Sequence, residues 1–370
     1  MADQGLTRRA APTSPPPQDH TETASEAGTG RGSEAMRFGL FGDAQAPRTT
    51  DGDPSRGFCE YIETSVEAER LGFYSTFLVE HHFSGSGQVS APLDLLGWVA
   101  ARTTSIRVGT AVLVLPWHDP VLLAERAATL DLLSGGRLDF GVGRGYRHSE
   151  FAGFCMPTEE AEARFDESLA VILKAWSSDE PFSHEGRFWR YHEIVVEPPT
   201  AQTPHPPVWI AAGKPESVRN VAVLGANLLL DQFASTEAIG ERIALFKAEC
   251  EARDRAFDPM DVAVARNLYV ARDADDASAA LARQAGVHDR MIERSRGPDG
   301  SRRSHIMAYA DKAGATEAHV LFGPPQEIIA GLQALQAVGV RYVLISGGEP
   351  THQSMQRFAA EVMPAFLHDS

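Results

Sequence analysis

An acid and two histidines end the apolar run Phe77-Leu78-Val79, in the order Glu80-His81-His82. The run predicts a buried strand, whose carboxyl end is where parallel α/β barrels carry their chemistry. Histidine accepts, donates or shuttles a proton near neutral pH, which suits a site that stabilises an anion or transfers a proton. Adjacent side chains at a strand-to-loop turn point in different directions, so one histidine is predicted to face the pocket. A loop histidine held by a structural hydrogen bond is the alternative.

Glycines alternate along Gly141-Val142-Gly143-Arg144-Gly145-Tyr146, at the end of another predicted strand. Glycine lets a ligand approach the backbone closely, and the planar guanidinium of Arg144 matches a phosphate or a carboxylate. A tight turn is the alternative explanation for the glycines. The embedded arginine makes the stretch a candidate anion site.

A third candidate site is Gly213-Lys214-Pro215-Glu216-Ser217, between a predicted strand and a predicted helix. Backbone N–H groups at the helix start, with Lys214, could hold a phosphate. An ordinary turn with a solvated lysine is the alternative. Ser346-Gly347-Gly348 is a rival phosphate site, and physical reasoning alone favours it, because barrel phosphate sites often follow the last strands.

Small residues also end a predicted strand at Thr110-Ala111-Val112. They leave room for a flat ring against the backbone. A barrel strand that needs little volume would have the same composition.

These four stretches could form one site only in a fold that places the ends of its strands close together. The hydrophobic pattern predicts such a fold. Eight apolar strands alternate with segments of helical periodicity, which is the count of a (β/α)8 TIM barrel. The predicted strands are 36–41, 75–80, 106–115, 137–142, 208–212, 227–230, 261–270 and 341–346.

The chain divides into two predicted parts. Residues 1–35, rich in Pro, Gly, Ser, Thr and Glu, predict a disordered N-terminal extension, and 36–370 predict one barrel. Aromatic residues predict a hairpin insertion at about 181–197. The stretch 273–319 is too long for a plain crossover, and its polar, breaker-rich middle makes 284–320 a candidate lid.

The composition excludes some classes of binding partner and site. The net charge of −16 over 370 residues disfavours nucleic acid and anionic membranes, because phosphates would be repelled. The 3 cysteines are widely spaced without a CxxC pair, which predicts neither a disulfide framework nor a metal site. With no apolar run of membrane length and no signal-peptide pattern, a cytoplasmic location is expected.

An ordered series of motifs resembles the bacterial luciferase family of flavin-dependent monooxygenases, over roughly residues 36–367. The motifs are Phe38-Gly39, Ala68-Glu69, Gly72-Phe73, Glu80-His81-His82-Phe83, Val108-Gly109-Thr110-Ala111, Val114-Leu115-Pro116, Asp119-Pro120-Val121, Ala124-Glu125, Leu130-Asp131, Ser134-Gly135-Gly136-Arg137-Leu138-Asp139-Phe140-Gly141, Gly143-Arg144-Gly145, Pro207-Val208-Trp209-Ile210-Ala211-Ala212 and Val362-Met363-Pro364.

The resemblance implies a barrel that binds reduced FMN, forms a flavin C(4a)-hydroperoxide with O₂ and inserts one oxygen atom into a small organic substrate. Since no dinucleotide fingerprint is obvious, a separate NAD(P)H:flavin reductase is expected to supply the FMNH₂. The resemblance also implies a dimer, expected to be a homodimer, through helices at 61–70 and 94–102. His81 matches the catalytic histidine, and Ala111-Val112 the pair joined by a cis peptide under the flavin ring. The implied cofactor-binding residues are Ala111, Val112, Arg144, Tyr146, Gly213, Lys214 and Ser217.

Some positions depart from luciferase itself. Gly213-Lys214 replaces an acid and a serine, Gly143 a cysteine and Gln232 a tryptophan. Flavin binding remains the expectation, whereas light emission and long-chain aldehyde specificity do not follow. Two alternatives stay open: a deazaflavin-dependent oxidoreductase that transfers hydride, and a non-catalytic flavin-binding subunit.

Overall fold

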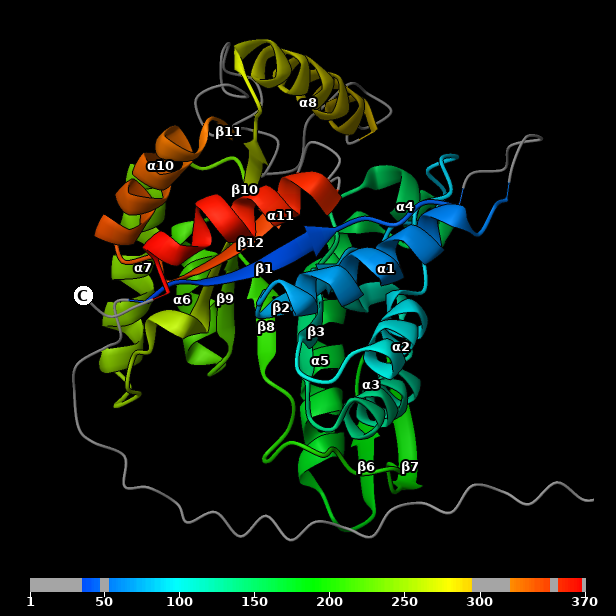
Figure 1. Ribbon diagram of the computed structural model, residues 1–370. Helices are drawn as coiled ribbons and strands as arrows, with labels where there is room; N and C mark the ends of the chain where they lie inside the picture. The colour runs from blue at the N-terminus through cyan, green and yellow to red at the C-terminus, as the bar shows by residue number, and fades with distance from the viewer. Residues whose placement is uncertain (1–34, 47–52, 295–319, 347–351, 368–370) are drawn as a thin grey trace, which may run out of the picture. The chain divides into compact units, whose positions relative to one another are not determined.

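Eight parallel strands close a barrel in the computed structural model, which describes residues 35–46, 53–294, 320–346 and 352–367 (Figure 1). The hydrogen-bonded order is β10-β12-β1-β2-β3-β5-β8-β9, and β9 returns to β10. The predicted TIM barrel is therefore confirmed. The strands are β1 (Arg37–Gly42), β2 (Ser75–Leu78), β3 (Arg107–Thr110), β5 (Leu138–Gly143), β8 (Val208–Ala211), β9 (Asn227–Leu230), β10 (Val262–Val270) and β12 (Tyr342–Ser346).

Helices cover the outside of the barrel, and sequence signals fix several of their ends. Asp119 accepts hydrogen bonds from two amides of the first turn of α3, and Gly135 ends that helix in the left-handed conformation. The covering helices are α1 (Arg56–Arg70), α2 (Pro92–Arg102), α3 (Pro120–Ser134), α5 (Ala161–Ser177), α6 (Pro215–Val223), α7 (Thr236–Glu251), α10 (Pro325–Ala337) and α11 (His352–Glu361).

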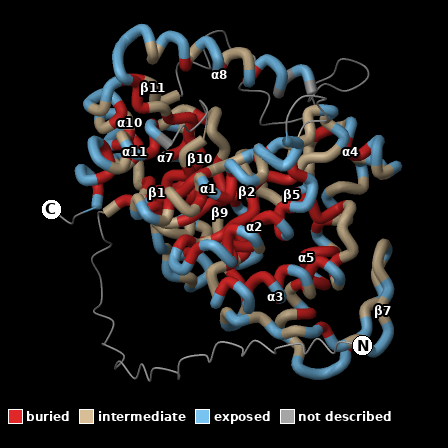
Figure 2. The backbone as a smooth tube through the Cα atoms, turned by 45° about the vertical axis from the view of Figure 1, so that its right-hand side comes forward, coloured by how far each residue is buried: buried red, intermediate tan, exposed pale blue. Residues whose placement is uncertain are grey.

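Buried residues, red in Figure 2, concentrate in the strands and on the helix faces turned toward them. Their side chains form an outer core between strands and helices and a smaller inner core that fills the barrel. Strand side chains alternate between the two, as the period of two requires. The inner core consists of Phe77, Trp209, Leu229, Ala263, Tyr342 and Leu344, with Ala111 and Val112 packed against it. The barrel is therefore filled, and chemistry is left to its rim.

Several elements differ from the sequence prediction. The strand predicted over 106–115 is interrupted after Thr110 and resumes as β4 (Leu113–Val114), followed by the short helix η1 (Leu115–Trp117). A six-residue helix, α4 (His148–Gly153), and a short strand beside β10, β11 (Leu321–Gly323), were not predicted.

Of the two predicted insertions, the hairpin lies wholly and the candidate lid partly within the described residues. Strands β6 (Phe182–Glu185) and β7 (Arg190–Ile194) pair antiparallel as a hairpin. The first part of the candidate lid, 284–294, belongs to the helix α8 (Ala274–Arg294). The rest of the lid, the N-terminal extension and the glycines of Ser346-Gly347-Gly348 lie outside the described residues.

Candidate active site

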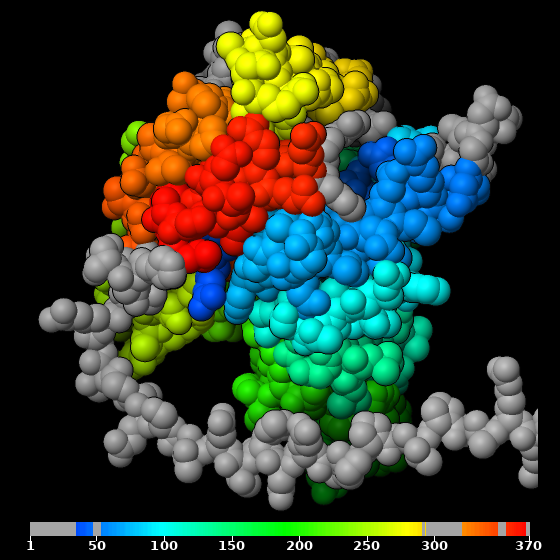
Figure 3. All heavy atoms as spheres, viewed as in Figure 1, coloured from blue at the N-terminus to red at the C-terminus, as the bar shows by residue number. Residues whose placement is uncertain are grey.

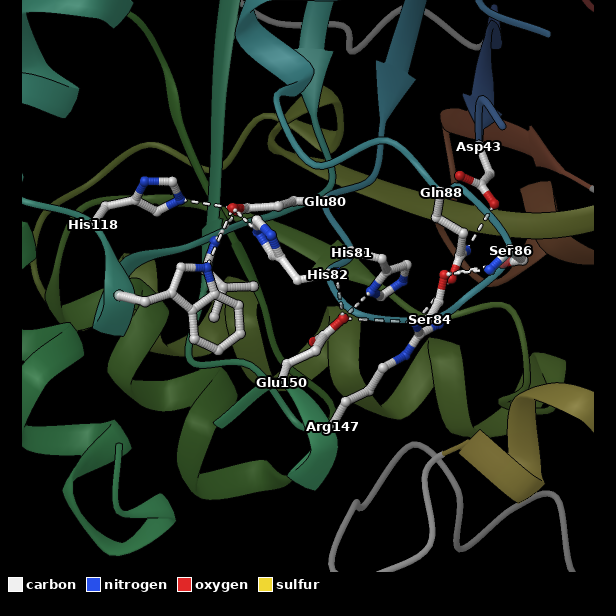
Figure 4. A network of polar contacts seen from close by, with 12 residues as sticks. Asp43, Glu80, His81, His82, Ser84, Ser86, Gln88, His118, Arg147 and Glu150 are labelled. Carbon is white, nitrogen blue, oxygen red and sulfur yellow. Dashed lines mark hydrogen bonds and ion pairs between the residues drawn. The ribbon is translucent and has the colours of Figure 1, made fainter. Parts of the chain in front are cut away.

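His81 lies just beyond β2, at the carboxyl end of the barrel, and is held by Glu150 of α4 (Figure 4). The distance from His81 Nδ1 to Glu150 Oε1 is 3.0 Å, and the same oxygen accepts the backbone N–H of His82 at 2.9 Å. An ionised carboxylate can only accept, so this bond assigns the proton to Nδ1 and leaves Nε2 available. Nε2 has no hydrogen-bond partner among the described residues.

His82 points the other way, toward Glu80, so the prediction of diverging side chains is confirmed. The buried Glu80 accepts hydrogen bonds from four groups, and three of them meet at Oε1. Its donors are His82 Nε2 at 2.8 Å, His118 Nε2 at 2.8 Å, Trp117 Nε1 at 3.2 Å and the Val114 amide at 2.7 Å.

The Glu80 carboxylate stays charged although it is 1% exposed. Burial raises the pKa of this carboxyl, but the hydrogen bonds from His118, His82 and the Val114 amide outweigh burial and lower the pKa to about 2. Glu80 therefore ties the end of β2 to the segment that follows β3.

That segment begins with a cis peptide bond between Ala111 and Val112. The cis bond that the resemblance implies is thus present. The Ala111 amide donates to the Leu78 carbonyl at 2.9 Å, and both residues of the pair pack on the inner core. The segment forms part of the rim one strand away from His81.

The alternating glycines make room for the protein itself. A Cβ on Gly141 would meet the Thr110 carbonyl oxygen, and one on Gly143 would lie 2.6 Å from Val112 Cγ2. Gly145 has φ +76°, a conformation that side chains rarely adopt. Close packing of β5 against the segment around the cis bond therefore requires the first two glycines, and the backbone conformation requires the third.

Arg144 and Tyr146 follow β5 and differ in their surroundings. Arg144 is exposed and forms a 2.9 Å ion pair with the exposed Glu162, which costs little to break in water. The Tyr146 ring meets the His81 ring edge-on, with centroids 6.3 Å apart. Tyr146 thus belongs to the histidine site, while the Arg144 guanidinium is able to turn toward an anion.

Gly213, Lys214 and Ser217 lie at the start of α6, just beyond β8. Lys214 is the exposed N-cap residue, and Ser217 lies in the first turn, where backbone N–H groups are unpaired. Since β8 pairs with β5, this loop and Arg144 follow adjacent strands. Two cations and a helix start on neighbouring loops fit a phosphate group, and the cis segment on the other side of β5 offers a surface for a planar ring.

Sequence reasoning missed three polar partners of this site. Glu150 is carried by the short α4, Arg147 lies just before it, and His118 follows η1. Arg147 is buried, and its Nη1 donates to Gln88 Oε1 at 3.0 Å and lies 3.6 Å from Glu150 Oε1. Its Nε has no hydrogen-bond partner within the described part of the chain. A carboxylate close in sequence to the candidate histidine would have been a usable signal. Glu150 gave none, because 69 residues separate it from His81.

Within the part of the chain that the structure describes, no cluster of three His, Cys, Asp or Glu side chains could hold a metal ion. In the same residues, no helix has the length and apolarity needed to cross a membrane.

A family model described as luciferase-like monooxygenase matches residues 36–342. The chain belongs to the luciferase-like monooxygenase family. Several of its relatives are named as monooxygenases, and two of them as flavin- or FMNH₂-dependent.

Two monooxygenase relatives align over much of the chain. The oxygenase component of a flavin-dependent trigonelline monooxygenase from Acinetobacter baylyi is 27% identical, covering 90% of this chain and 96% of that one. An FMNH₂-dependent dimethylsulfone monooxygenase from Pseudomonas putida is 27% identical, with 71% and 75% covered. The chain spans 60% and 55% of the length of two further relatives, both uncharacterised proteins of Sinorhizobium fredii.

One relative is named for a different cofactor, F420. An F420-dependent glucose-6-phosphate dehydrogenase from Kineococcus radiotolerans is 25% identical, with 81% of this chain and 90% of that one covered.

Solved structures share the fold. Monooxygenase RslO1 from Streptomyces bottropensis has a TM-score of 0.74 at 26% identity, with 89% of this chain and 99% of that one covered. The oxygenating constituent of 3,6-diketocamphane monooxygenase from Pseudomonas putida, in complex with FMN, has a TM-score of 0.73 at 20% identity, with 91% and 100% covered.

Proposed function

We propose that the protein is the oxygenase of a two-component system, which binds reduced FMN, activates O₂ as the flavin C(4a)-hydroperoxide and oxygenates a small organic substrate. One oxygen atom enters the substrate and the other leaves as water, with FMNH₂ supplying the two electrons. The observation that carries this proposal is His81, which is fixed by Glu150 with Nε2 available, one strand from the cis segment.

Each site residue has a physical role in this proposal. Arg144, Lys214 and the amides around Ser217 bind the phosphate of FMN, since cations and a helix start favour an anion. Gly213 leaves room at that loop. Ala111 and Val112 support one face of the ring, with Tyr146 beside His81.

His81 hydrogen-bonds the reacting oxygen through Nε2. Glu150 keeps the proton of the neutral imidazole on Nδ1, so Nε2 can accept a proton and later return it. Exclusion of water around this position would lengthen the life of the oxygenated flavin.

A separate NAD(P)H:flavin reductase supplies FMNH₂ in this proposal. The sequence contains no G-x-G-x-x-G fingerprint for a dinucleotide, so the chain offers no recognisable site for the reductant. The name of the trigonelline relative, an oxygenase component, supports the same division of labour.

The decisive test is an anaerobic titration with reduced FMN, followed by rapid mixing with O₂ and absorbance recording. We expect tight binding, and a long-lived absorbance transient that is shortened or lost in His81→Ala. An unchanged transient in His81→Ala would remove His81 from the mechanism. Binding of reduced FMN without any transient would support the non-catalytic subunit, and tighter binding of F420 than of FMN would support deazaflavin chemistry.

We also propose that the protein is a homodimer, with α2 and α3 at the interface. Both helices lie at the surface on the face shown in Figure 3, and the large apolar side chains that they expose support this placement. They are Trp98, Leu122, Leu132 and Leu133. The exposed residues of α1, by contrast, are mainly charged, so the proposed interface moves from α1 toward α3.

A further inference from the structure

Asn267, near the end of β10, has a buried side chain without a hydrogen-bond partner for its carbonyl oxygen. The residue is 3% exposed, and Oδ1 makes no hydrogen bond among the described residues. A buried polar group normally finds a partner, because leaving one unpaired costs free energy. Such exceptions call for an explanation in function.

The side chain of Asn267 faces the inside of the barrel. Ala263 of the same strand belongs to the inner core, whereas Val262, Val264 and Leu268 belong to the outer core. The period of two then places Asn267 on the inner face.

Asn267 also lies at the carboxyl-terminal rim. It pairs in register with Ser346, the last residue of β12. Ala265, one step deeper on the same face, pairs with Leu344 of the inner core. Asn267 therefore lies above the apolar filling, at the level where chemistry takes place in such barrels.

The cis segment lies directly across the barrel from Asn267. In the closed order, β12, β1 and β2 separate β10 from β3 on one side, and β9, β8 and β5 do so on the other. Ala111 and Val112 come directly after β3. A ring supported by this pair would thus have its other face turned toward β10.

The width of an eight-stranded barrel can be compared with the thickness of a ring and one more small molecule. Eight tilted strands about 4.8 Å apart give a barrel about 15 Å across, measured between backbones. A ring at about 3.5 Å from the cis segment, and a substrate about 3.5 Å beyond it, occupy about half of that distance. The remainder matches an asparagine side chain plus a hydrogen bond of about 3 Å.

We propose that Asn267 binds the substrate directly, through a hydroxyl or amide group of an uncharged molecule lying between the flavin and β10. Either orientation of the Asn267 amide is satisfied by a group that both donates and accepts. A neutral amide would not offset the desolvation of a charged group, which favours uncharged substrates. This inference rests on the proposed function, because it takes the flavin to lie on the cis segment.

The first measurement concerns stability without any ligand. Asn267→Leu replaces the unpaired amide with an apolar side chain of similar size, so we expect its Tm to rise by about 2 °C. Asn227→Leu is the matched control, because Asn227, at the amino end of β9, accepts from Arg255 Nη2 at 3.2 Å. Its Tm should fall. A fall in Asn267→Leu as well would show that Asn267 has a partner within the protein and would overturn the proposal.

The second measurement concerns binding. A library of several hundred uncharged fragments, half of them carrying a hydroxyl or amide group, is screened by ligand-observed NMR against the FMN-loaded wild type and both variants. We expect hydroxyl- and amide-bearing fragments to be lost selectively from Asn267→Leu, and affinity for reduced FMN to change less than about twofold.

The outcomes separate the two proposals. Suppose that the wild type binds reduced FMN, but that wild type and Asn267→Leu bind the same set of fragments or none at all. This result would overturn the role of Asn267 and leave the proposed function intact. Failure of the wild type to bind reduced FMN overturns the proposed function instead.

Discussion

The paired histidines show how neighbouring residues of one type acquire different tasks. His81 is bound to Glu150 and keeps one nitrogen available, whereas His82 is bound to Glu80 within a buried network. The sequence showed that the two must diverge. It did not show which carboxylate each would meet, because Glu150 lies 69 residues further along the chain than His81.

Glu150 should act on the reaction through His81, as a positioning residue. We expect Glu150→Gln to shorten the absorbance transient by about 10-fold, because the glutamine amide can donate to His81 Nδ1 as well as accept from it, so the proton and the orientation of His81 are no longer fixed. Affinity for reduced FMN should change less than twofold.

Glu60→Gln, which removes an exposed carboxylate on α1, is the control and should match the wild type. A Glu150→Gln protein with normal stability and a normal transient would contradict this role.

Glu80 should contribute to stability in a pH-dependent way. A pKa lowered from 4.5 to about 2 corresponds to about 3 kcal/mol, which is fully present above pH 4.5 and is lost as the pH falls toward 2. Glu80→Gln should therefore lower the free energy of unfolding by about 3 kcal/mol at pH 7 and by much less at pH 3. Urea denaturation at both pH values measures this, and an equal loss at both would refute the assignment.

At the scale of elements, the strands were predictable because their apolar runs are long and separated by clear turn signals. The hydrophobic pattern did not predict the break after Thr110, since the residues on both sides of the cis bond have ordinary strand composition, and only the family resemblance implied the cis bond. Helix α4 has six residues, too few for a helical period to show. Much of the site therefore rests on local features that periodicity does not reveal.

Packing of β5 against the cis segment can be tested with one methyl group. In Gly143→Ala the new Cβ would lie 2.6 Å from Val112 Cγ2, and valine is too stiff at χ1 to yield easily. We expect the free energy of unfolding, measured by denaturation, to fall by roughly 1–3 kcal/mol. Binding of reduced FMN, measured by titration, should weaken by about 10-fold.

Gly97→Ala provides the comparison, because Gly97 lies in α2 with open space around its Cβ position. That substitution should stabilise the protein by up to about 1 kcal/mol. The packing argument fails if the two variants behave alike.

At the scale of the whole molecule, net charge and exposed apolar surface have opposite effects on the proposed association of two copies. Two copies with a net charge of −16 each repel one another, so association depends on apolar contact and should strengthen as salt screens the charge. The barrel itself was predictable from the sequence. The proposed association face could not be read from the sequence in the same way, since exposure of Leu122 and Leu133 depends on how α3 packs.

Trp98, which is 65% exposed on α2, provides the test of the dimer. We expect the wild type to have twice the mass of one 40.1 kDa chain, and Trp98→Glu to have the mass of one, by light scattering. Val287→Glu, the same change at an exposed apolar residue of α8, should leave the dimer intact. A monomeric wild type at moderate salt would end the proposal.

Hydrogen exchange at the Val114 amide should report local opening of the barrel rim. This amide donates to a buried carboxylate at 2.7 Å, two residues beyond the cis bond, and water reaches it only when the Glu80 network opens. Its deuterium uptake should therefore be as slow as that of the barrel strands, although it lies at the rim. In Glu80→Gln the same amide should exchange early, so that a single isotope label reports how often the rim comes apart.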